Sequence, residues 1–177
     1  SCTTNAEPVE TVVVHTDLKV DSYFHSDNET LNWMYDAAVR TFLDNVHGCI
    51  PFDCPTREKL GWTNDAQSSC EQILTNFEAE KLLTKWHQDI RDAMSPEGAL
   101  PGIVPSSGWG FHWGNGPVSD GILFELPYRV YLHTGNQALL VSSLPYFCRY
   151  LRYLESRKES NGLVTFGLGD WAAPGGK

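Results

Sequence analysis

Three carboxylates, Asp53, Glu58 and Asp65, lie within a stretch of 13 residues that also contains Arg57 and Lys59. Paired carboxylates serve general acid and base catalysis, and burial beside apolar rings raises a carboxyl pKa toward the range that suits an acid near neutral pH. A solvated charge cluster in which Asp65 caps the next helix is the alternative interpretation. The apolar flanks of the stretch favour burial, and therefore an active site; they are Ile50, Phe52, Leu60 and Trp62.

Four of the six tryptophans lie in long segments without helical periodicity, at Trp62, Trp109, Trp113 and Trp171. Helix packing does not explain a large ring in a glycine-rich loop. A ring beside carboxylates can stack on the apolar face of a sugar while the carboxylates accept hydrogen bonds from its hydroxyls. For Trp109 and Trp113, a plug beneath the loop is an equally good interpretation. The other two tryptophans, Trp33 and Trp86, follow helical stripes and are expected in the core.

The elements that must position these residues are mainly helical. Apolar residues recur with helical spacing over 31–46, 66–77, 79–93, 117–133 and 136–157. A β-branched run at 12–14 with alternation through Val20 predicts one or two strands within 8–24. Tight connections between the second and third helices and between the fourth and fifth alternate with long ones. In an antiparallel array this alternation brings the long loops to one end.

Composition excludes several classes of function. The chain has 177 residues and a formal net charge of −9, which argues against binding to nucleic acid or to anionic lipid, and no apolar run is long enough to span a membrane. The N-terminus has no signal-peptide pattern. The six histidines lack metal-ligand spacing, so neither a catalytic metal nor a cofactor is expected. Five irregularly spaced cysteines predict small buried thiols; these are Cys2, Cys49, Cys54, Cys70 and Cys148.

The segment DCPTREKLGWTNDA, residues 53–66, closely resembles the signature of the bacterial α-L-rhamnosidases of glycoside hydrolase family 78. The segments PGIVPSSGWGFHWGNGPVSDG at 101–121 and GLGDW at 167–171 are similar to that family in the same order. The resemblance implies that residues 23–177 form the first half of an (α/α)6 toroid, a six-hairpin glycosidase fold. Residues 1–22 are then a β-strand linker or the remnant of a preceding β-sandwich domain.

The resemblance also implies a reaction, the hydrolysis of terminal α-L-rhamnosyl residues with inversion in a rhamnose-containing glycoside or polysaccharide. Glu58 matches the family's proposed general acid. The general base is expected beyond Lys177, so we expect the chain alone to be inactive. Cytoplasmic and periplasmic locations in a bacterium both remain open. The positions that match substrate-binding residues are Asp53, Arg57, Trp62, Asp65, Trp109, Trp113, Asp120 and Trp171. Asp120 is almost as well explained by a helix-dipole role.

Two other functions remain open on the sequence. One is a carbohydrate-binding or scaffold segment, which needs the tryptophans but not Glu58. The other is an (α/α)6 glycosidase that acts on a different sugar. A half-toroid leaves apolar helix faces uncovered, so self-association through that surface is also expected.

Overall fold

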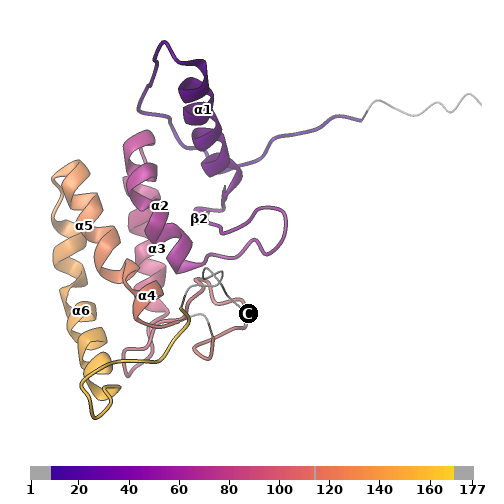
Figure 1. Ribbon diagram of the computed structural model, residues 1–177. Coiled ribbons are helices and arrows are strands. Elements are labelled where there is room, and N and C mark those ends of the chain that lie inside the picture. The colour runs from indigo at the N-terminus through magenta and orange to yellow at the C-terminus, as the bar shows by residue number, and fades with distance from the viewer. Residues whose placement is uncertain (1–8, 114, 170–177) are drawn as a thin grey trace, which may run out of the picture.

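The computed structural model describes residues 9–113 and 115–169, so Cys2 and Trp171 lie outside the described residues. This part of the chain is mainly helical, and the five expected helices are confirmed (Figure 1). The fourth is divided by Gly121 into a four-residue turn and a longer helix. The helices are α1 Glu29–Asp44, α2 Thr63–Asn76, α3 Glu80–Asp92, α4 Pro117–Asp120, α5 Ile122–Thr134 and α6 Ala138–Ser156.

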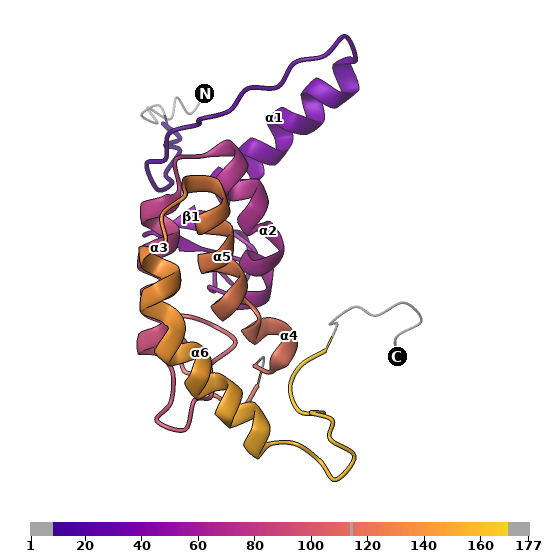
Figure 2. The same ribbon diagram turned by 90° about the vertical axis from the view of Figure 1, so that its left-hand side faces the viewer.

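Helices α2, α3, α5 and α6 form the main stack, and tight turns join α2 to α3 and α5 to α6. Helix α5 lies between α2, α3 and α6 (Figures 1 and 2). The pair α5–α6 turns at Gly135, whose φ of 72° is the left-handed conformation that ends many helices. The core between the pairs contains fully buried side chains from three helices, among them Ile73, Leu83, Trp86, Ile90, Leu123 and Leu126. Trp86 is therefore a core residue, as expected.

A proline inside α5 is compensated by a histidine from α3. Pro127 has no N–H to donate to the carbonyl of Leu123, one helical turn earlier. His87 Nε2 lies 2.9 Å from that carbonyl oxygen and donates to it in the neutral tautomer. His87 is fully buried, and burial lowers its pKa to about 4. The imidazole is thus neutral at physiological pH, and the helix continues past the proline.

Helix α1 projects from the stack (Figure 2). Its start is fixed by the Asn28 side chain, which accepts hydrogen bonds from the N–H groups of Thr30 and Leu31 at 2.9 and 3.3 Å. The expectation that Trp33 is a core residue is wrong, because its side chain is 69% exposed. Helical periodicity predicts where the helix lies. It does not show whether another part of the described chain covers the helix face that carries Trp33.

The β structure differs in place from the sequence expectation. In residues 9–24 the chain is extended, and its β pairing there is a single isolated bridge between Val20 and Phe77. A two-stranded antiparallel sheet instead follows α1, with β1 Val46–His47 and β2 Ile50–Pro51. Gly48 and Cys49 connect them with φ values of 58° and 62°, the conformation of a tight hairpin turn.

The expectation of buried thiols holds for only part of the set. Cys70 is buried and its pKa is raised to about 11, chiefly by desolvation. Cys49 and Cys148 are exposed and Cys54 is half-buried, so the expectation is wrong for the two exposed residues. Across residues 9–113 and 115–169, no helix has the length and apolar character needed to cross a membrane.

The long connections gather at one end of the stack. The tight turns after α2 and α5 lie at the upper end in Figure 1, whereas residues 93–113 and 157–169 lie toward the lower end. This is the arrangement that the alternation of connection lengths predicts, and it brings the aromatic loops to one region.

Candidate active site

The loop from Asp53 to Trp62 has a fixed backbone. Asp53 and Leu60 are joined twice, by Asp53 N–H to Leu60 O and by Leu60 N–H to Asp53 Oδ1, both at 3.1 Å. Trp62 forms an isolated antiparallel bridge with Ile103 of the next long loop. Gly61 is required at this crossing, since a Cβ there would lie 2.3 Å from the carbonyl oxygen of Val104. The two loops are therefore held together.

The Glu58 carboxylate is held at both oxygens. Trp62 Nε1 donates to Glu58 Oε2 at 2.8 Å, and Arg57 Nη2 lies 2.8 Å from Glu58 Oε1. Trp62 thus places its indole directly against the carboxylate. Glu58 itself is exposed, so the expectation that its apolar flanks bury this carboxylate is wrong. The Arg57 side chain is 71% exposed, so the ion pair is a surface interaction of small net strength.

Three tryptophans from two loops form one aromatic cluster, Trp62, Trp109 and Trp113. The ring centroids of Trp109 and Trp113 are 5.0 Å apart, and Trp62 lies 5.3 Å from Trp113 in an edge-on arrangement and 6.4 Å from Trp109. Trp109 and Trp113 are 45% and 37% exposed. This exposure disfavours the core-plug interpretation of both rings and leaves an aromatic surface beside Glu58.

The remaining carboxylates of the loop lie within electrostatic range of one another. The pKa of Asp65 is raised, first by partial desolvation and then by the negative charges of Asp53 and Glu58. Asp65 is in the first turn of α2 and remains open to solvent. The structure therefore brings together five of the sequence-predicted residues of this loop, namely Asp53, Arg57, Glu58, Trp62 and Asp65.

Asp120 is not part of this open surface. It is 1% exposed, and its Oδ2 accepts hydrogen bonds from Tyr150 Oη at 2.8 Å and Gly116 N–H at 3.2 Å. Its Oδ1 is buried with no hydrogen-bond partner in the described structure. Desolvation raises the Asp120 pKa to about 7, and desolvation, with the Asp120 charge, raises that of Tyr150. Asp120 links α4 and its preceding loop to α6.

The third loop crosses the second at a pair of glycines, Gly116 and Gly167. A Cβ on Gly116 would lie 2.6 Å from Gly167 Cα, and both residues have positive φ values, 123° and 106°. Leu168 N–H donates to Asn115 O at 2.9 Å. The segment that leads to Trp171 is thereby fixed beside the loop that contains Trp113, while Trp171 itself lies outside the described residues.

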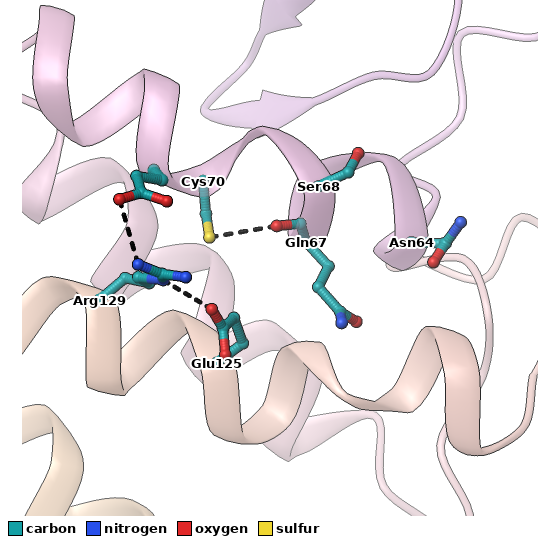
Figure 3. Close-up of a pocket in the computed structure, with 7 residues that line it drawn as sticks. Asn64, Gln67, Ser68, Cys70, Glu125 and Arg129 are labelled. Atoms are coloured by element: carbon teal, nitrogen blue, oxygen red, sulfur yellow. Dashed lines mark hydrogen bonds and ion pairs between the residues drawn. The ribbon is translucent and has the colours of Figure 1, made fainter.

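A polar hollow of about 260 Å³ between α2 and α5 contains residues that the sequence interpretation missed (Figure 3). Arg129 bridges Glu125 at 2.6 Å and Glu71 at 3.1 Å, and the Cys70 thiol donates to Gln67 O. The four-residue spacing of Glu125 and Arg129 on one helix is the sequence pattern that could have predicted their ion pair. No ligating group of three or more histidine, cysteine or acidic side chains occurs among the described residues.

Comparison with known proteins decides the family. Residues 19–177 match the model of the bacterial alpha-L-rhamnosidase 6 hairpin glycosidase domain. The chain belongs to this family. An alpha-L-rhamnosidase of Formosa agariphila is 31% identical over 96% of this chain and 19% of its own length. The chain is therefore part of an alpha-L-rhamnosidase catalytic domain.

Two solved α-L-rhamnosidase structures are similar at 30% sequence identity. The Streptomyces avermitilis enzyme, complexed with L-rhamnose, gives a TM-score of 0.81 over 89% of this chain and 15% of its own. The Dictyoglumus thermophilum enzyme gives 0.84 over 93% of this chain and 18% of its own. The fold expectation of a helical segment of a six-hairpin glycosidase domain is confirmed. The chain spans less than a fifth of the length of these relatives.

Proposed function

We propose that this chain supplies the acid half of an inverting α-L-rhamnosidase site, with Glu58 as general acid. In such a reaction the acid protonates the leaving glycosidic oxygen while a second carboxylate activates water on the opposite face of the sugar. That second carboxylate is contributed from outside these 177 residues. The observation that carries the proposal is that the Trp62 indole contacts both the Glu58 carboxylate and the rings of Trp109 and Trp113 from the next long loop.

The surroundings of Glu58 suit a positioned acid. The Trp62 indole fixes the direction of Oε2, and the exposed Arg57 bonds only the other oxygen. The pair with Arg57 is a surface interaction of small net strength, so the Trp62 indole is the main contact that positions the Glu58 carboxylate. The similar Streptomyces avermitilis enzyme was solved with L-rhamnose, which supports a rhamnosyl ligand for this surface.

The neighbouring carboxylates then act on the sugar. Asp53 and Asp65 flank Glu58 and can accept hydrogen bonds from rhamnosyl hydroxyls, while Trp62, Trp109 and Trp113 offer apolar faces to the ring. Arg57 can donate to a ring or linkage oxygen. For Asp120, burial beneath Gly116 supports an indirect role that holds the loop rather than contact with the sugar.

The test of the acid role is Glu58→Gln in an active catalytic domain that contains this segment. We expect a loss of about 10²–10⁴-fold in kcat/KM on a substrate with a poor leaving group. The loss on an activated aryl rhamnoside should be much smaller, because its aryl group leaves without being protonated. Hydrolysis rates of both substrates are measured over the same pH range.

Asp65→Asn is the matched control, since it removes a second carboxylate from the same loop. This substitution is expected to lower kcat/KM for both substrates by similar factors, because the lost contact is with the rhamnosyl group that both substrates share. Equal losses on the two substrates for Glu58→Gln contradict the acid role. A difference between substrates for Asp65→Asn, with none for Glu58→Gln, assigns the acid to Asp65 instead.

A further inference from the structure

A second hollow, of about 510 Å³, lies between α3 and the loop that carries Trp109 and Trp113. Its floor and one wall come from α3 and its other wall from the loop 101–111. Lys85, Asp89 and Asp92 share the solvent face of α3, since they are spaced at i, i+4 and i+7. The volume is within the range of ligand pockets in proteins.

One loop lines both the tryptophan cluster and this hollow. The centroids of the Trp109 and Trp113 rings are 5.0 Å apart, and two of the three residues between them in the chain, Gly110 and Phe111, line the second hollow. A Cβ on Gly110 would meet no atom within 4 Å, so the space above it is open. Residues that line the hollow therefore follow directly after Trp109 of the cluster along the chain.

The lining has the chemistry of a site for an uncharged sugar. Phe111 offers a ring that is 40% exposed, and Pro101 and Pro105 add apolar surface. Asp92 Oδ1 accepts one hydrogen bond, from Gln88 Nε2 at 2.6 Å, and a carboxylate has room for about three more. Asp89 is paired with Lys85 at 2.5 Å. With two carboxylates and one lysine the lining has a net negative charge, which disfavours an anionic ligand such as a phosphate or a uronate. The hydroxyls of a neutral sugar can instead donate hydrogen bonds to both carboxylates.

We propose that this hollow binds a neutral glycosyl residue of the substrate that lies beyond the rhamnosyl group held at the tryptophan cluster. The inference rests on the proposed function, because it takes the cluster as the place of the terminal rhamnosyl group. Phe111 stacks on the second sugar, and Asp89 and Asp92 accept bonds from its hydroxyls. The site favours rhamnose-terminated oligosaccharides over small rhamnosides.

The experiment compares the binding of two probes to the purified chain by isothermal titration calorimetry. One probe is L-rhamnose, and the other is a neutral tetrasaccharide with a non-reducing terminal α-L-rhamnosyl residue. We expect the tetrasaccharide to bind wild type about tenfold more tightly than L-rhamnose, which corresponds to about one stacked ring and its hydrogen bonds. Phe111→Ala and Asp92→Asn are expected to reduce that advantage to about twofold or less and to leave L-rhamnose affinity unchanged.

Tyr128→Ala is the matched control, because Tyr128 is an aromatic residue on α5 that is 48% exposed and lines neither hollow. It should leave the affinity for both probes unchanged. The inference alone is overturned if L-rhamnose binds but the tetrasaccharide has no advantage, or if both variants keep the full advantage. If neither probe binds wild type, this surface does not bind sugar, which contradicts both the sugar contacts of the proposed function and the inference, whereas the acid role of Glu58 is decided separately by the Glu58→Gln kinetics. Asp92→Asn keeps the side-chain volume, so the test remains decisive if Phe111→Ala does not fold.

Discussion

At the scale of single residues, Asp120 is the group whose chemistry depends most on the fold. Its ordinary pKa is 3.8, and desolvation raises it to about 7 in the folded chain. The carboxyl therefore binds a proton more tightly when folded than when unfolded. Its contribution to stability is full below about pH 4 and is lost as the pH rises through about 7.

We predict that Asp120→Asn removes this part of the pH dependence. By linkage, the free energy of unfolding of wild type should fall by up to about 4 kcal/mol between pH 4 and pH 8 relative to the variant, because asparagine does not ionise. Urea denaturation at pH 4, 6 and 8 measures it. Asp36→Asn, which removes an exposed carboxylate from α1, is the control and should parallel wild type. Parallel curves for wild type and Asp120→Asn would contradict a buried, proton-binding Asp120.

Residue types and spacing were sufficient to predict much of the candidate site. The clustering of carboxylates and aromatic residues in long loops predicted a shared surface, which the contacts of Trp62 with Glu58 and Trp113 bear out. The burial of Asp120 could not be predicted in this way, because its partner Tyr150 is 30 residues away and only the packing of α6 brings the two together. The exposure of Trp33 was missed for a similar reason, since periodicity does not show what covers a face.

At the scale of elements, apolar periodicity predicted the positions of the helices. It did not predict how a proline within a helix is accommodated, because that depends on side chains from neighbouring helices. The proline in α5 illustrates this. A proline inside a helix often kinks or ends it, whereas α5 continues past Pro127, where His87 of α3 donates to the freed carbonyl of Leu123. No local pattern links His87 to Leu123, which lies 36 residues away.

We predict energetic coupling between His87 and Pro127. His87→Ala should destabilise wild type by about 2–4 kcal/mol, because it removes a buried side chain and leaves the Leu123 carbonyl without a donor. In a Pro127→Ala background the new N–H of residue 127 can donate to that carbonyl, so the same change should cost about 1–2 kcal/mol less. Free energies of unfolding for the four proteins of the cycle measure the coupling.

Pro145→Ala provides the control for that cycle, because Pro145 interrupts α6 rather than α5. His87→Ala should cost the same with and without it. Additive effects of His87→Ala and Pro127→Ala, equal to those with Pro145→Ala, would show that the imidazole does not compensate for the proline.

At the scale of the whole molecule, one outer face of the stack is apolar and open. Val141, Leu144, Cys148 and Leu151 lie within one stripe along α6, and each of the three aliphatic side chains is more than half exposed. Tyr128 and Leu132 of the neighbouring α5 are 48% and 53% exposed. Figure 2 shows α6 along the outside of the helix stack. Contiguous apolar surface of this kind favours association.

We predict that the isolated chain self-associates through the α6 stripe. Burial of the stripe against a second copy removes apolar surface from water at about 25 cal/mol per Å², which favours a dimer at micromolar concentrations and above. Sedimentation velocity should show a mass that rises above 19.8 kDa with concentration. The double variant Leu144→Glu, Leu151→Glu should remain monomeric, because two copies would bring four carboxylates into an apolar contact. Leu31→Glu with Met34→Glu on α1 is the matched control and should still associate. If wild type is a monomer at every concentration, or if only the α1 variant prevents association, the α6 stripe is not the interface.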